Sequence, residues 1–360
     1  MESMTYISEM SQYNFAISIL AMLLLGFGFL MVFVKQNGFN ALTGTYLIVA
    51  SVLPLYLLIK GLGIIGEPIG TSSIISLLLA EFAAASALIA MGAVLGKLKC
   101  WQYILLGVLI VPFYMLNEWL VTDGAFGITK TFTDPAGSIG IHMFGAYFGM
   151  GLTFAIQSTK HREKPVESDY TSDRFSMIGS MVLWIFWPSF CSAIVAPAEI
   201  IVTAINTVLA LCGATLCTFL MSTVLRKGKV SIADITNASL AGGVAIGATC
   251  NTAAPWQAFI IGVAAGTVCV IGYTIIQPIL EKKLNIADTC GVHNLHGMPG
   301  LMGGIAAMFI VPGIASGQLA GIAATFVISL IGGLIVGAVI RLTGLRSQAY
   351  DDGEEFEVSE

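Results

Sequence analysis

The sequence predicts an all-α membrane protein whose chain crosses the bilayer eleven times. Of its 360 residues, 56% are hydrophobic and only 10% are charged, whereas soluble domains usually carry about 25% charged residues. The mean hydropathy is +0.88, and the forty glycines suit helices that pack closely in lipid. The apolar residues also occur in runs of about 20, the length that a membrane-spanning helix needs.

Eleven such runs follow one another along the chain. Their boundaries are approximate, and the tenth is the least regular because it contains several glycines and Pro299. The predicted spans are 13–34, 40–62, 72–96, 101–121, 136–157, 175–195, 198–225, 231–250, 255–276, 289–312 and 317–341.

Basic residues determine the predicted orientation, because they are enriched on the cytoplasmic side of membrane proteins. Fourteen of the sixteen lysines and arginines fall in loops after odd-numbered spans or in the segment that closes the last span. Only Lys60 and Lys130 fall on the other side. We therefore expect the N-terminus outside and the C-terminus inside, and this asymmetry also supports the number of spans.

One pattern occurs twice, at the start of the fifth span and at the start of the tenth. DPAGSIGIH runs from Asp134 to His142, and DTCGVHNLH runs from Asp288 to His296. Both stretches have aspartate, glycine and histidine at the same offsets. Because five spans separate the copies, they enter the membrane from opposite sides. This is the signature of an inverted repeat, whose functional site lies near the midplane.

The repeat predicts that the two histidines meet inside the membrane. Eight residues of α-helix rise about 12 Å, so His142 and His296 lie that far in from opposite faces of a hydrocarbon core about 30 Å thick. A lone histidine in a membrane often only hydrogen-bonds a neighbouring helix. Two histidines at matching depths favour a functional site, because ionisable groups inside a membrane usually mark a pathway.

The two aspartates of the pattern are interpreted first as helix caps. Asp134 precedes Pro135, the order found where an N-cap residue precedes a proline at the first helical position. Asp288 is followed by Thr-Cys-Gly and suits the same role. Capping would orient the histidine helices without any contact with substrate. A carboxylate at each mouth would also attract a cation, and this second interpretation stays open.

No metal or cofactor is expected. His293 and His296 have a spacing found among metal ligands, but the acids that stand out inside the spans, Glu81 and Glu118, belong to no E-x-x-H motif. The seven cysteines form no C-x-x-C pair and lie mostly in apolar runs, where cysteine behaves as a small hydrophobe. A membrane metalloenzyme that uses the two histidines is the least favoured alternative.

The spans predict one membrane domain over residues 1–342, with pseudo-repeats 13–157 and 175–312 and a closing helix at 317–341. The last ten residues, DDGEEFEVSE, carry six acids. Because blocks of like charge are usually solvated, we expect 343–360 to be a disordered cytoplasmic tail. A tail that docks a partner is the alternative.

Two facing imidazoles suit a small uncharged solute. A neutral imidazole offers one donor and one acceptor, so a pair can relay a hydrogen bond or a proton. Two charged imidazoles together in lipid would be very costly. The spans offer no ring of acids for hydrated metal ions and no internal arginine for anions. Ammonia that arrives as ammonium and leaves a proton behind fits these limits, and water or carbon dioxide fits almost as well.

Six segments resemble the Rh branch of the ammonium transporter (Amt/Rh) superfamily. They run in collinear order between about residues 20 and 342 and read LGFGFLMVF, GAVLGKL, GSIGIHMFGAYFG, VLWIFWPSF, NASLAGGVAIG and DTCGVHNLHGMPGLMGGI. The resemblance implies eleven helices in two inverted five-helix halves plus a final helix. It further implies a homotrimer in the plasma membrane with one pore per subunit, which conducts ammonia and is not an enzyme.

The resemblance also implies roles for individual residues. His142 and His296 match the paired histidines of the family's pore, and Asp134 matches the aspartate at its outer mouth. Phe82 and Phe190 match the two phenylalanines of the outer gate. From the residues alone, both phenylalanines would be ordinary core or lipid-facing side chains.

Three further positions matter for the comparison with the family. Glu118, in LNEWL, resembles an acid of the outer vestibule. Cys191 stands where the family often has asparagine, and Thr122 stands where Amt-type members have the tryptophan of a cation–π ammonium site. Thr122 therefore implies weaker outer binding and channel-like behaviour. The extra N-terminal helix and glycosylated outer loop of animal members are missing, which implies a microbial protein.

The expected partners are ammonia or ammonium, the lipid bilayer and further copies of this chain, and no nucleic acid is expected. Methylammonium and carbon dioxide stay candidate solutes. Two other functions stay open, namely a carbon dioxide channel and an ammonium sensor that signals through the acidic tail.

Overall fold

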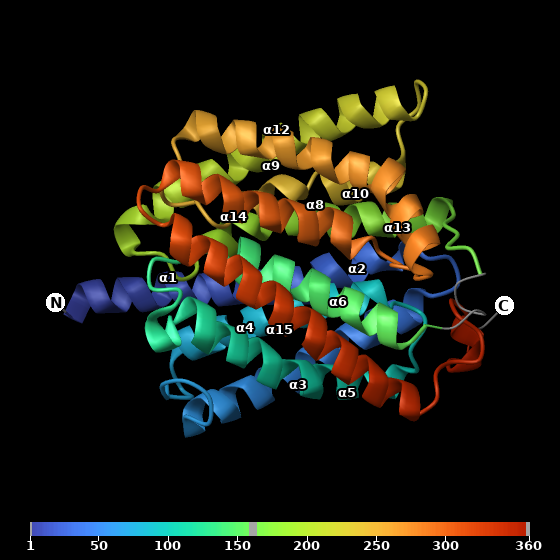
Figure 1. The fold of residues 1–360 in the computed structure, drawn as a ribbon, viewed down its shortest axis with the longest axis horizontal. Coiled ribbons are helices and arrows are strands. Elements are labelled where there is room, and N and C mark those ends of the chain that lie inside the picture. Colours follow the sequence, from blue (N-terminus) through green and yellow to red (C-terminus); the bar gives the residue numbers. More distant parts are fainter. Residues whose placement is uncertain (1, 158–163, 358–360) are drawn as a thin grey trace.

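The structure, a computed structural model, describes residues 2–157 and 164–357, and within these ranges every regular element is a helix. The helices form a single bundle and run mostly along its long axis (Figure 1). Helix α1 begins at one end of the bundle, and the segment that follows the last helix lies at the other end. The prediction of an all-α fold is confirmed.

The first half of the chain contains the helices up to and directly after the first histidine pattern. Several of these helices begin or end with a π-helical or 3-10 turn. Its elements are α1 (Glu2–Ala21), η1 (Met22–Phe27), α2 (Gly28–Leu30), η2 (Met31–Phe33), α3 (Gly38–Leu62), α4 (Ile74–Ala93), α5 (Cys100–Asn117), η3 (Glu118–Thr122), η4 (Ala125–Gly127), η5 (Ser138–Met143) and α6 (Phe144–Ala155).

The second half of the chain contains the helices that follow residue 164. Its elements are α8 (Tyr170–Ser192), η6 (Pro197–Glu199), α9 (Ile200–Leu225), α10 (Ile232–Ala238), α11 (Ala241–Ile246), α12 (Pro255–Ile271), η7 (Gly272–Ile276), α13 (Gln277–Leu284), η8 (His293–Gly297), α14 (Met298–Ile310), α15 (Ala315–Leu342) and η9 (Asp352–Glu354).

Eight helices in the described part of the chain are long and apolar enough to cross a membrane. They correspond to eight of the eleven predicted spans. The other three, 136–157, 231–250 and 289–312, also contain helices, but these are shorter, interrupted, or opened by a π-helical turn. The physical reason is that polar and glycine-rich residues occupy their starts, so the uninterrupted apolar helix is shorter than the span.

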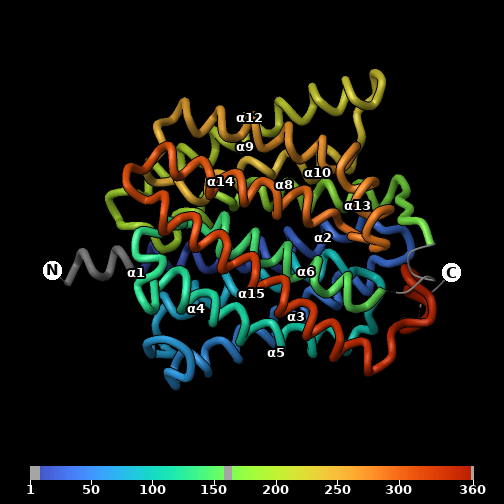
Figure 2. The backbone as a smooth tube through the Cα atoms, viewed as in Figure 1, coloured from blue at the N-terminus to red at the C-terminus, as the bar shows by residue number. Residues whose placement is uncertain are grey.

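Glycines let the helices approach until their backbones touch. A Cβ atom on Gly333 of α15 would lie 2.0 Å from the carbonyl oxygen of Phe148 in α6, and one on Gly262 of α12 would lie 2.0 Å from that of Ala210 in α9. Small residues at such positions are typical of helix contacts in lipid. In the view of Figure 2, α9 and α12 form one side of the bundle and α3 and α5 the other, with α6 and α14 between them.

The acidic C-terminal segment packs onto the helices, which differs from the disordered tail expected from its charge. The Asp352 carboxylate accepts hydrogen bonds from the N–H groups of Phe39 (2.8 Å) and Asn40 (2.9 Å) and so caps the start of α3. Arg346 is buried and lies 3.5 Å from the Glu354 carboxylate. Local charge could not indicate the partners of Asp352, which are 313 and 312 positions away in sequence. Residues 358–360 of the expected tail lie outside the described ranges.

Candidate functional site

The first copy of the repeated pattern opens its helix with a tight, capped turn. The Asp134 carboxylate accepts hydrogen bonds from the N–H groups of Ile139 (2.9 Å) and Gly140 (2.7 Å). Gly137 has a φ of +75°, a conformation that residues with a Cβ rarely adopt. In the π-helical turn η5 that follows, the N–H of His142 donates to the Gly137 carbonyl at 2.9 Å. The pattern thus determines where this helix begins.

The second copy repeats the arrangement. The Asp288 carboxylate accepts hydrogen bonds from the N–H groups of Val292 and His293, both at 3.0 Å, and Gly291 has a φ of +67°. A π-helical turn, η8, again follows and carries His296. In both copies the aspartate carboxylate caps the helix, through Oδ2 alone in Asp134 and through both oxygens in Asp288.

The two histidines lie against each other in the interior of the bundle. Nδ1 of His142 is 3.2 Å from Nδ1 of His296. The ring centroids are 5.3 Å apart, and the ring planes differ by 12°. Their exposed fractions are 2% and 5%. Since a neutral imidazole has one donor and one acceptor nitrogen, the contact requires one ring to donate and the other to accept.

Aromatic rings continue from His142 toward the expected gate. The Trp187 ring stacks on His142 with centroids 5.6 Å apart, and the Phe190 ring lies 6.0 Å from it. Phe190 in turn contacts Phe82 at 4.7 Å, and each phenylalanine is only 3% exposed. Trp187 had no expected role, although its three-residue spacing from Phe190 places both on one helix face.

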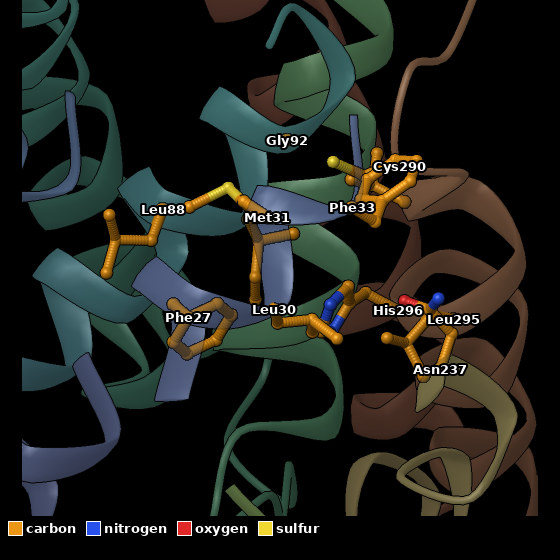
Figure 3. Close-up of a pocket in the computed structure, with 12 residues that line it drawn as sticks. Phe27, Leu30, Met31, Phe33, Leu88, Gly92, Asn237, Cys290, Leu295 and His296 are labelled. Carbon is orange, nitrogen blue, oxygen red and sulfur yellow. The ribbon is translucent and has the colours of Figure 1, made fainter. Parts of the chain in front are cut away.

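A small cavity adjoins His296 on the other side of the pair, as Figure 3 shows with its lining side chains. The Phe27 ring stacks on His296 with centroids 6.4 Å apart. Most of the lining is apolar, including Leu30, Leu88 and Leu295. The volume of about 20 Å³ suffices for one molecule the size of water. Phe27 was also given no role from sequence, because nothing local distinguishes it from other apolar residues.

Glu118, the expected vestibule acid, does not present a free carboxylate. Its oxygens lie 2.7 Å and 2.9 Å from the hydroxyl of Tyr56, and Lys60 Nζ lies 3.2 Å away. The other acid that stood out in the spans, Glu81, is fully buried. Its carboxyl has no hydrogen-bond partner among the described residues.

His293 does not join the histidine pair. Its ring lies edge-on to that of Tyr147, with centroids 5.8 Å apart, whereas His296 contacts His142. Within residues 2–157 and 164–357, no group of three or more His, Cys, Asp or Glu side chains is arranged to hold a metal ion.

Comparisons with known proteins agree with one another. A family model described as Ammonium Transporter Family matches residues 1–360. Ammonium transporter Rh type B of Takifugu rubripes is 38% identical over 379 residues, which cover 94% of this chain and 80% of that protein. Rh type A of Bos taurus is 38% identical and covers 98% and 85%. The solved structure of Nitrosomonas europaea Rh50, of the Rhesus protein family of channels, is 57% identical, with a TM-score of 0.97 and coverage of 98% and 93%.

Proposed function

The chain belongs to the ammonium transporter family, and we propose that it is an Rh-type ammonia/ammonium channel whose conduction path runs past His142 and His296. The observation that carries this proposal is the Nδ1–Nδ1 contact of 3.2 Å between the two buried rings. Two capped helices of opposite direction supply these rings, and aromatic side chains flank them. This arrangement offers polar atoms to a small solute at one point of an otherwise apolar path.

The paired imidazoles suit ammonia rather than an ion. Ammonia both donates and accepts hydrogen bonds, so it can replace either ring as the other's partner. A charged ammonium ion beside two buried imidazoles would have no counter-ion, and that is strongly unfavourable in a low-dielectric interior. The ammonium ion therefore gives a proton to water at the entrance, ammonia crosses, and it takes a proton from water on the far side.

Phe82 and Phe190 form the outer gate in this proposal. Their rings are in contact, with centroids 4.7 Å apart, so one of them must rotate before a molecule reaches His142. Asp134 and Asp288 hold the histidine helices by capping them. Both oxygens of Asp288 take part in its cap, whereas Asp134 caps through Oδ2 alone, and its buried Oδ1 has no hydrogen-bond partner among the described residues.

The full topology is part of the proposal. Eleven crossings, in pseudo-repeats 13–157 and 175–312 with a closing helix, place the N-terminus outside the plasma membrane and the basic loops inside. Outward-facing apolar side chains such as Phe309 and Leu342, which are 84% and 87% exposed, suit contact with lipid. A homotrimer with one pore per subunit would cover part of the same apolar surface.

Proteoliposomes test the proposed path. Under an ammonium gradient, we expect the internal pH to change faster than in protein-free vesicles, and His142→Leu or His296→Leu to abolish the difference. His293→Leu is the matched control, because it changes a histidine of the same helix that packs on Tyr147, and it should retain conduction. Equal rates in wild-type and protein-free vesicles would reject the channel, and unaltered rates in both pair variants would reject this path.

A further inference from the structure

Lys60 holds its ammonium group inside a small polar cluster near the end of α3. Its Nζ lies 3.2 Å from Glu118 Oε2 and 3.9 Å from Asp123 Oδ2. Tyr56 binds the same Glu118 carboxylate through its hydroxyl. Lys60 is 5% exposed and Glu118 9%. The ion pair is therefore largely shielded from water and from screening by salt.

The cluster contains two carboxyl groups and one ammonium group, and the loop at Gly66 lies against it, while the Asp123 side chain is 43% exposed. A Cβ atom on Gly66 would lie 3.7 Å from Lys60 Nζ and 3.6 Å from Asp123 Oδ2. Gly66 has a φ of +72°, which glycine adopts without strain. The position between the two acids is thus bounded by the loop backbone and filled by the lysine head group.

That head group is chemically close to the transported species. A lysine side chain ends in a compact primary ammonium with three N–H donors. Methylammonium has the same head group, and ammonium differs only by a fourth hydrogen. The carboxylates that hold Lys60 Nζ would therefore hold a free ammonium ion in the same way.

The cluster lies at the end of the molecule where the His142 helix begins. Glu118 is the first residue of η3, and Thr122 is its last. Thr122 lies close to Gly140 in the His142 helix. A Cβ atom on Gly140 would lie 3.8 Å from Thr122 Oγ1 and 3.6 Å from Asp134 Oδ2. An acid at this place is expected to attract ammonium. In the structure, Lys60 already satisfies that acid.

We infer that Lys60 lowers the affinity of this end of the channel for ammonium, because its own primary ammonium occupies the position between Glu118 and Asp123 that a free ammonium ion fits. The expected change in transport rests on the proposed function, whereas the expected binding of ammonium between the two acids does not. Removing Lys60 leaves a shielded carboxylate without a counter-ion, which is strongly destabilising. The vacated position then takes up a small cation from solution.

Thermal unfolding of purified Lys60→Ala protein tests the binding without any transport. In sodium chloride, we expect its melting temperature to fall below that of the wild type. Ammonium or methylammonium chloride at the same ionic strength should restore it, and tetramethylammonium should not, because it has no N–H donor and is too large. The wild type should respond equally to all of these salts.

Arg226→Ala is the matched control. It breaks another ion pair of a buried acid, in which Arg226 Nε lies 2.7 Å from Asp234 Oδ2. The arginine side chain is 36% exposed, so water replaces it once it is removed. We expect the melting temperature of this variant to be lower than that of the wild type. Ammonium should raise it no more than sodium does. Adding Glu118→Gln to Lys60→Ala should also abolish the response to ammonium.

The inference is overturned if ammonium stabilises Lys60→Ala no more than sodium does, since the cluster is then a structural ion pair only. If Lys60→Ala does not fold in sodium, Lys60→Met, which keeps the apolar stem, is purified in each salt. Recovery of folded protein in ammonium alone supports the inference, and equal recovery overturns it.

Transport gives the second measurement. In vesicles, Lys60→Ala should reach half-maximal flux at a roughly tenfold lower ammonium concentration, the factor that corresponds to about 1.4 kcal/mol of added interaction. An unchanged half-maximal concentration, together with rescued stability, would overturn the claim about affinity. Failure of His142→Leu to block conduction would affect the proposed path and leave the thermal result untouched.

Discussion

The hydroxyl of Tyr350 lies 3.2 Å from the hydroxyl of Thr289, which follows Asp288, the cap of the His296 helix. Thr289 also donates to the Leu95 carbonyl at 3.2 Å, and Tyr350 is 3% exposed. The segment that follows the closing helix α15 in sequence therefore packs around the start of the His296 helix.

This packing makes the acidic segment a contributor to stability. Asp352→Ala removes the cap of α3, and we expect the free energy of unfolding to fall by about 1 kcal/mol. Glu357→Ala, which changes an exposed acid of the same segment, should leave the melting temperature unchanged. Equal melting temperatures for the two variants would mean that Asp352 does not hold the segment on the helices in solution.

Deletion of 343–360 is expected to lower stability as well, because it removes the buried Arg346 and Tyr350. A sensor function of the segment is therefore better tested with exposed positions such as Glu357. A loss of nitrogen response in Glu357→Ala, with transport intact, would support signalling through this segment.

The cap of the His296 helix should be needed for conduction. Asp288→Ala leaves the N–H groups of Val292 and His293 without their acceptor, which costs about 1–2 kcal/mol, and it frees the turn that positions His296. We expect vesicle conduction and melting temperature to fall together. Asp288→Asn keeps one acceptor oxygen and should preserve most of both. If asparagine abolishes conduction at full stability, the carboxylate charge itself takes part.

Trp187 is expected to hold the His142 ring in place. A Cβ atom on Gly243 would lie 2.5 Å from Cε2 of Trp187, so Gly243→Ala displaces the indole from its present position against His142. Such overpacking costs about 1–3 kcal/mol, and we expect slower conduction in vesicles. Gly70→Ala, where nothing lies within 4 Å of the new Cβ, is the control. Normal conduction in a less stable Gly243→Ala protein would limit Trp187 to packing.

Lys97 makes stability depend on pH. It lies in the loop between α4 and α5, and burial lowers its pKa from 10.5 to about 8. Between these values the unfolded chain keeps the proton that the folded protein has released. Stability therefore rises with pH across this window, by about 3 kcal/mol at most. Below pH 8 the cost of burying the charge is present in full.

Melting temperatures between pH 8 and pH 10.5 check this expectation. The wild type should show a rise in melting temperature with pH, and Lys97→Met should abolish this rise. Lys229→Met, which changes an exposed lysine, should retain it. If Lys97→Met and wild type have the same slope, Lys97 is not a source of the pH dependence.

The order of the amino acids was enough to predict the all-α class, the positions of the apolar helices and the matched aspartate, glycine and histidine of the two patterns. These features depend on neighbours within a few residues. An apolar run needs about 20 residues to span lipid, a cap acts on the next turn of the helix, and a glycine with positive φ acts at its own position. Residues of these kinds can therefore be recognised in the sequence without knowing how the chain packs.

The packing of the helices against one another sets which side chains face each other. His142 and His296 are 154 positions apart, Lys60 and Glu118 are 58 apart, and Phe39 and Asp352 are 313 apart. Each contact depends on how far two helices rotate and slide against one another, and the shapes of all the side chains between them set that geometry. Hydropathy and local charge do not specify that geometry. The pairing of the Glu118 carboxylate with Lys60 and the packing of the C-terminal segment therefore could not be predicted.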